Sequence, residues 1–293
     1  MKKYEFALTL AVLTLAFVLA VHYKSNASES VEAKKAAEPR KLVLKKSNTV
    51  SLRMPIFPST AQNVKEELIA KSADLPAGEP LYLYLETPGG SITAGESLIQ
   101  TALGLGREIK TVNNFSASMG YITAQSLGER LITPDGVLMA HRAKVGIDGQ
   151  MPGEFNTMAA FIQESIEAIE HRVSDRMGVS HKEYQDLVRN EFWVTGQKAV
   201  DAKAADAVVR VTCASDLQGE YDEYVQTAFG TAVVTWKSCP LLAEMVGVSF
   251  AQMKFSSALE EERVTTLIRS ALTNRRFVAA DNSTMNSISA VLR

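Results

Sequence analysis

Short apolar runs that alternate with segments of helical periodicity are the feature that most restricts the fold of this chain. The alternation begins at about Asn48 and ends near Val209. Within it, PLYLYLET predicts a strand that ends at the glycine pair Gly89-Gly90, and SITAGESLIQTAL predicts the helix that follows. Repeated strand–helix units of this length imply a parallel sheet with right-handed crossovers. The predicted fold class is therefore α/β.

The same pattern predicts the remaining elements of this region. Strands are expected at TVSLRM, EIKTVNN, RLIT and VLMAH, the last two separated by a turn at 134–136. Helices are expected around Val64 and Leu68, over 118–127, over 150–177 and over 180–189. The segment EFWVTGQKAVDAKAADAVV is expected to form a strand, a turn and a helix that close the domain.

Composition excludes several classes of function. The chain has 293 residues, of which 46% are hydrophobic, and this suits one good-sized domain with an appendage. A formal net charge of −2 gives no sign of nucleic-acid binding. The four histidines and two cysteines show no metal-ligand spacing, and no glycine-rich phosphate-binding loop occurs. We therefore expect neither a metal nor a cofactor.

The N-terminal segment has the pattern of an export signal. Lys2 and Lys3 precede an apolar run over 6–21, and Ser25-Asn26-Ala27 offers small residues before a cleavage point. The run is long for a signal and short for a spanning helix, which needs about 20 apolar residues. Residues 1–27 are therefore expected to be a signal peptide or a membrane anchor, and 28–47 a linker. Both alternatives predict that the rest is exported, to the periplasm or outside the cell, or anchored in the membrane.

Three segments carry residues suited to nucleophilic chemistry. Ser118 opens a predicted helix, where unpaired N–H groups favour anions. Gly89 and Gly90 follow a strand and allow the backbone to approach a ligand closely. His141 ends another strand and is a candidate base. Taken singly, Ser118 could be a helix cap, the glycine pair an ordinary turn and His141 a structural histidine. The interpretation therefore depends on the order and spacing of the three segments.

Taken together, these segments resemble the proteolytic subunit of the Clp protease, within the wider group that shares the crotonase fold. The resemblance covers about 50–209 and includes LYLYLETPGGSITAG and SASMGYITAQSLGERLITPDGVLMAHR. It implies repeated β-β-α units around a parallel sheet. It also implies that Ser118 is the nucleophile, that His141 is the general base, and that Gly90 and Met119 supply the oxyanion-hole N–H groups.

One position departs from the family pattern. The third member of the family's triad is an aspartate in an Arg-Asp-x-Phe stretch, and here RNEF places Asn190 there. Asparagine can accept a hydrogen bond from the imidazole, but it supplies no charge to the imidazolium. Asp186 and Glu191 are alternative third members.

The expected function is that of a serine endopeptidase that cuts peptides or unfolded chains. An exported protein meets no ATP, so we expect it to work without the family's ATPase partner. Homo-oligomers are expected through the 150–177 helix, which lies between stacked rings in the resembled family. The alternatives are an inactive scaffold or peptide-binding protein, an acyl-CoA hydratase or isomerase, and a Ser-Lys peptidase. For the last of these no lysine sits at an obvious base position, although Lys144 is near His141 in sequence.

The two cysteines lie in the predicted C-terminal extension, 211–293, outside a domain expected to span 48–210. Strands expected around 208–213 and 231–237 each approach a cysteine, and antiparallel pairing of these strands would bring Cys213 near Cys239. A disulfide is expected, worth about 3 kcal/mol for a loop of this size, and two buried thiols are the alternative. A hairpin and a helix are expected in this extension.

Overall fold

The computed structural model describes residues 39–227, 230–242, 245–250, 255 and 257–273. The predicted signal over 1–27, most of the predicted linker and the polar end of the chain lie outside the described residues. No helix in the described part is both long enough and apolar enough to cross a membrane.

A seven-stranded sheet forms the centre of the domain, with the strand order β1-β7-β5-β4-β3-β2 and β6 added beside β5. All of these pairs are parallel except β5 with β6. The strands are β1 (Arg40–Leu44), β2 (Thr49–Leu52), β3 (Leu81–Thr87), β4 (Ile109–Ala117), β5 (Arg130–Ala140), β6 (Phe192–Thr195) and β7 (Ala207–Cys213). The mostly parallel α/β fold predicted from the sequence is confirmed.

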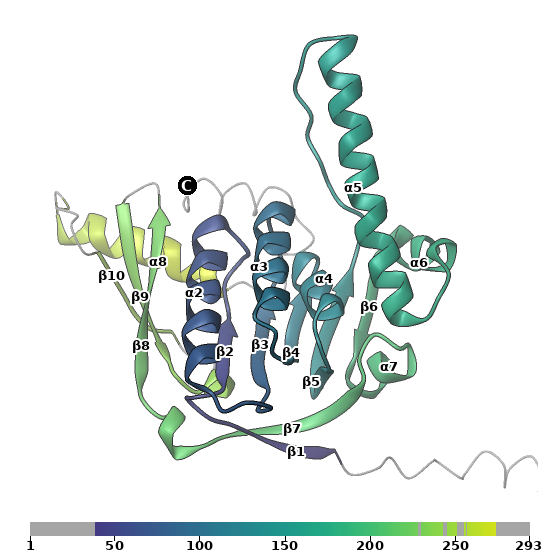
Figure 1. Ribbon diagram of the computed structural model, residues 1–293. Coiled ribbons are helices and arrows are strands. Elements are labelled where there is room, and N and C mark those ends of the chain that lie inside the picture. The colour runs from purple at the N-terminus through teal and green to yellow at the C-terminus, as the bar shows by residue number, and fades with distance from the viewer. Residues whose placement is uncertain (1–38, 228–229, 243–244, 251–254, 256, 274–293) are drawn as a thin grey trace, which may run out of the picture. The chain divides into compact units, whose positions relative to one another are not determined.

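Helices cover one face of this sheet, as Figure 1 shows for α2 (Pro58–Asp74), α3 (Ile92–Gly104) and α4 (Met119–Ser126). Their apolar sides pack on β2 and β3, with Leu68, Leu83 and Leu98 fully buried. Because β3 is covered on both faces, it is an almost continuous apolar run and shows no polar alternation.

Two features differ from the predicted strand pattern. Residues 40–44, assigned to the linker, form β1, because Leu42 and Leu44 are buried beside β7. The predicted turn at 134–136 lies inside β5, which is one continuous strand. Pairing with β4 passes from Ile132 directly to Val137, so the residues between them form a bulge. The turn-forming residues Pro134, Asp135 and Gly136 therefore lie in a bulge, and the chain continues in the same direction instead of reversing.

Helix α5 (Gly153–Met177) is the longest helix among the described residues and projects beyond the other helices of the domain (Figure 1). Its buried residues, Val173, Ser174 and Met177, all lie near its C-terminal end. The chain continues through α6 (His181–Leu187), the short 3-10 helix η1 (Val188–Asn190), β6 and α7 (Gly196–Asp201). The predicted strand, turn and helix after residue 190 thus correspond to β6 and α7.

The C-terminal part forms a second, antiparallel sheet in the order β10-β9-β8. It contains η2 (Ser215–Leu217), β8 (Glu220–Thr227), β9 (Gly230–Lys237), η3 (Pro240–Leu242), β10 (Met245–Phe250) and α8 (Ala258–Thr273). Val234 and Trp236 of β9 pack with Val264 and Ile268 of α8 in a small apolar core.

The predicted disulfide is confirmed, and it joins Cys213 to Cys239 with 5.9 Å between their Cα atoms. The predicted reason was wrong, because the two strands do not pair with each other. Strand β7 pairs with β1 and β5 in the main sheet, whereas β9 pairs with β8 and β10. The bond therefore ties the C-terminal sheet to the main sheet.

Candidate active site

Ser118 lies at the sharp junction between β4 and α4. Its φ of 54° is in the left-handed region, which costs a non-glycine residue about 1–3 kcal/mol. The surrounding backbone holds it there: its N–H donates to the carbonyl of Met139 at 2.9 Å, and its carbonyl accepts from the N–H of Ile122 at 3.1 Å. A strained strand-to-helix turn of this kind presents a side chain at the edge of a sheet, as in known serine nucleophiles.

His141 follows the last residue of β5, the strand next to β4. The pairing of Ala117 with Met139 brings the ends of the two strands together. As a result, Nε2 of His141 lies 2.7 Å from Oγ of Ser118, within hydrogen-bond distance. Burial lowers the pKa of His141, which favours a neutral ring able to accept a proton; the charge of Glu191 opposes this effect, and that of Lys144 adds to it.

The glycine turn after β3 packs directly against Ser118. A Cβ atom on Gly89 would come within 2.5 Å of the carbonyl oxygen of Ala117 and 2.7 Å of the nitrogen of Met119. Gly89 and Gly90 both have positive φ, so only glycine suits this path. Among the described residues, the N–H groups of Gly90 and Met119 have no hydrogen-bond partner. Two free backbone donors beside a serine can bind an anionic oxygen.

Two residues expected as third members of the triad make no hydrogen bond to His141. Asn190 ends η1 with its side chain exposed. Asp186 is also exposed and pairs with Lys182 at 3.4 Å and with Arg189. The positive charge of Lys182 has the larger effect and, together with that of Arg189, lowers the pKa of Asp186. Within the described part of the chain, Nδ1 of His141 has no hydrogen-bond partner.

Glu191 is the acidic residue whose charge reaches His141 and raises its pKa. Strand β6 runs antiparallel to β5 with Phe192 opposite Ala140, and Glu191 directly precedes Phe192, just as His141 directly follows Ala140. Its carboxylate accepts a hydrogen bond from Nε1 of Trp193 at 3.0 Å. The sequence contained Glu191 beside Asn190, and the negative charge of Glu191, which acts on His141, distinguishes the two.

Comparison with known proteins gives evidence on the family of this chain that is independent of the site geometry. Residues 32–212, more than half of the chain, match the Clp protease family. This chain belongs to the Clp protease family. It is a serine-type peptidase, as the resemblance of its motifs implied.

Several curated relatives of this Clp protease family member carry the name ATP-dependent Clp protease proteolytic subunit. The protein of that name from Streptococcus agalactiae serotype V is 28% identical over 154 residues, covering 50% of this chain and 79% of the relative. The one from Streptococcus uberis is 25% identical over 170 residues, covering 57% and 86%. Proteolytic subunit 1 from Leifsonia xyli subsp. xyli is 27% identical over 168 residues, covering 56% and 84%.

The family match includes Ser118, His141 and the glycine turn, and it ends one residue before Cys213. The C-terminal sheet and α8 therefore lie outside the part of this peptidase that matches the family.

Proposed function

We propose that the chain hydrolyses peptide bonds with Ser118 as the nucleophile and His141 as the general base. The observation that carries this proposal is the 2.7 Å contact between Nε2 of His141 and Oγ of Ser118. Oγ attacks the carbonyl carbon while Nε2 takes its proton. The resulting oxyanion is held by the N–H groups of Gly90 and Met119. His141 then gives the proton to the leaving amine. In the second step a water molecule gives a proton to His141 and attacks the acyl-enzyme, and His141 returns the proton to Oγ of Ser118 as the acid product leaves.

The positive charge that develops on His141 needs a counter-charge. Glu191 supplies it in our proposal, because its charge already acts on the imidazole in the free protein. This counter-charge acts through space, since the Glu191 carboxylate is hydrogen-bonded to Trp193. An orienting role for Asn190 or Asp186 stays a prediction.

Labelling with a fluorophosphonate probe tests the nucleophile. The wild-type protein should react, and peptide mapping should find the probe on Ser118. Ser118→Ala should remain unlabelled, whereas Ser126→Ala, a control in the same helix α4, should react at the wild-type rate. Labelling of Ser118→Ala at the wild-type level would overturn the assignment.

The peptidase is further proposed to be exported and to act without an ATPase, although its relatives are named ATP-dependent. The Lys2-Lys3 start, the apolar run and the Ser25-Asn26-Ala27 stretch support export. A disulfide is typical of oxidising compartments outside the cytosol and supports the same view. Purified protein should cleave a fluorogenic peptide or an unfolded chain at the same rate with and without ATP.

A further inference from the structure

The segment 53–56 runs from the end of β2 to the glycine turn and contacts both the turn and the C-terminal sheet. At the turn, the N–H of Ile56 donates to the carbonyl of Gly89, and the carbonyl of Ile56 accepts from the N–H of Ser91, both at 2.8 Å. The residues on either side of Gly90 are thus both hydrogen-bonded to Ile56, and Gly90 itself is paired with Ile56 as in a parallel sheet. A Cβ atom on Gly90 would meet the carbonyl oxygen of Ile56 at 2.4 Å, which shows how closely the backbones approach.

Thr87 connects this segment to the turn through its hydroxyl group. Oγ1 donates to the carbonyl of Met54 at 2.7 Å and accepts from the N–H of Gly89 at 3.1 Å. The side chain is fully buried, so solvent does not compete for either bond. Thr87 therefore fixes the direction of the peptide that leads into Gly90.

The other end of the segment is held by the C-terminal sheet. Nη1 of Arg53 donates to the carbonyl of Lys237 at 2.9 Å, and its guanidinium lies 5.9 Å from the centre of the Trp236 ring. The neighbouring Met54 packs in the apolar core of the C-terminal sheet, with Val234 among its members. These contacts tie two consecutive residues of the segment to strand β9.

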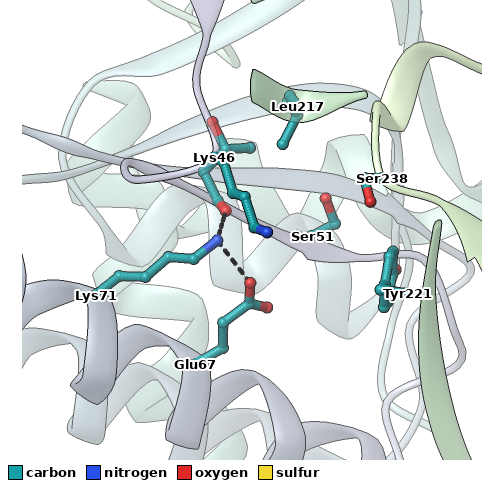
Figure 2. Close-up of a pocket in the computed structure, with 8 residues that line it drawn as sticks. Lys46, Ser51, Glu67, Lys71, Leu217, Tyr221 and Ser238 are labelled. Carbon is teal, nitrogen blue, oxygen red and sulfur yellow. Dashed lines mark hydrogen bonds and ion pairs between the residues drawn. The ribbon is translucent and has the colours of Figure 1, made fainter. Parts of the chain in front are cut away.

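The seam between the two sheets is less well packed further along β2. A cavity of about 90 Å³ lies there, between β2, α2 and the start of the C-terminal sheet (Figure 2). Lys71, one of its lining residues, pairs with Glu67 and donates to the carbonyl of Thr49. The direct contacts between the C-terminal sheet and the segment 53–56 are thus those of Arg53 and Met54, at the end of β2 away from this cavity.

Burial of the charged Arg53 side chain costs desolvation free energy, so this residue is not explained by stability alone. It is 1% exposed, and its Nε and Nη2 atoms have no hydrogen-bond partner among the described residues. An apolar side chain of similar length would avoid this desolvation cost. Its Nη1 hydrogen bond to Lys237 and the position of its guanidinium over the Trp236 ring instead fix the backbone position of residue 53 relative to β9.

We propose that the C-terminal sheet positions the oxyanion turn through the segment 53–56, with Arg53 and Thr87 as positioning residues. This inference rests on the proposed function, in which Gly90 supplies an oxyanion donor. It gives the C-terminal part, which lies outside the family match, a role in turnover. Displacement of the turn would weaken binding of the transition state and leave binding of the substrate largely unchanged.

Thr87→Val and Thr87→Ser test the hydroxyl group. Valine keeps the shape and removes both hydrogen bonds, whereas serine keeps the hydroxyl. Thr87→Val should lower kcat about tenfold or more with KM unchanged, because a misplaced oxyanion donor costs rate and not substrate binding. Its affinity for a peptide boronic acid, which forms a tetrahedral adduct on serine, should fall by a similar factor. Thr87→Ser should restore both values.

Arg53→Met tests the link to the C-terminal sheet, and Glu220→Gln is the control. Glu220 pairs with Lys237 at 2.7 Å within the C-terminal hairpin and makes no hydrogen bond or ion pair to Arg53. Arg53→Met should lower kcat and boronic-acid affinity with KM unchanged, and Glu220→Gln should leave all three at wild-type values. If circular dichroism shows that Arg53→Met is unfolded, Arg53→Lys, which keeps the buried charge but loses the planar guanidinium over Trp236, should show the same loss.

Failure of this inference is distinguishable from failure of the proposed function. A wild-type protein that is not labelled on Ser118 would overturn the proposed function. A protein that is labelled there, and whose folded Thr87→Val and Arg53 variants keep the wild-type kcat and boronic-acid affinity, would overturn this inference alone.

Discussion

At the scale of single residues, the site depends on a serine held in a strained conformation and a histidine whose pKa is lowered by burial. The φ of Ser118 is kept positive by hydrogen bonds to neighbouring backbone, so the hydroxyl is presented without further rearrangement. Burial lowers the pKa of His141 below its ordinary value. The ring therefore remains an available base at pH values where an exposed histidine is partly protonated.

Glu191→Gln is expected to change both rate and pH dependence. The charge of Glu191 raises the pKa of His141, so its removal lets that pKa fall further. The acid limb of the kcat/KM profile should therefore move to lower pH, while kcat at the plateau should fall about tenfold because the imidazolium loses its counter-charge. Asp186→Asn is the matched control, since Asp186 pairs with Lys182 and Arg189, and it should leave the profile unchanged. A larger loss in Asp186→Asn would assign the role to that residue.

Asn190→Asp is expected to preserve or raise kcat. Position 190 is exposed and adjacent to Glu191, and a second carboxylate there adds negative charge near the imidazolium. Steady-state kinetics on a fluorogenic peptide measures the effect. A large loss of activity would indicate that the asparagine amide itself orients His141.

At the scale of elements, α5 carries more apolar surface than its own domain covers. Phe161 is 64% exposed and Met158 is 43% exposed, and both lie in the N-terminal half of α5, away from its buried residues. Apolar side chains gathered in this way are typical of an interface with another protein. We propose that α5 forms the contact between copies of this chain, which agrees with relatives named as subunits.

Ile162→Glu on α5 is expected to dissociate the assembly, because a carboxylate buried in an apolar interface lacks a partner. Phe161→Glu should act in the same way. Light scattering after size exclusion should give a larger mass for the wild type than for these variants, and Glu164→Gln, an exposed polar position on the same helix, should keep the wild-type mass. A wild-type monomer at micromolar concentration would contradict the proposal.

At the scale of the whole molecule, the Cys213–Cys239 bond joins the two sheets across a sequence separation of 26 residues. Closing a loop of this length restricts the unfolded chain by about 3 kcal/mol in free energy. The bond also fixes the C-terminal sheet whose strand β9 contacts Arg53.

Replacement of both cysteines by serine should therefore lower the free energy of unfolding by about 3 kcal/mol, measured by urea denaturation. In protein isolated from its native compartment, non-reducing mass spectrometry should find the bond intact and a chain that begins at Ser28, after cleavage of the signal. Two free thiols in that sample, with Met1 retained on a protein in the cytosol, would overturn the proposed export and with it the ATP-independent mechanism.

Local sequence patterns were sufficient for much of the fold. The apolar run of β3, the glycine turn and the periodicity of α3 each depend on neighbouring residues, and so their order along the chain predicted a parallel sheet. The same order placed Ser118 and His141 at the ends of adjacent parallel strands, which meet at one edge of a sheet, and the two side chains do lie together. Their proposed roles came from the resemblance to the Clp protease family.

Other features depended on which strands pair, and no local pattern contains that information. Burial against β7 made residues 40–44 a strand, and the pairing of β6 with β5 brought the segment that begins β6 beside the end of β5. The disulfide was predictable from two cysteines, but only the fold showed that it joins two sheets. Arg53 and Lys237 are 184 residues apart, and their contact exists because the C-terminal sheet packs beside the end of β2. Periodicity is a local property of the chain, whereas such contacts are decided by packing between distant segments.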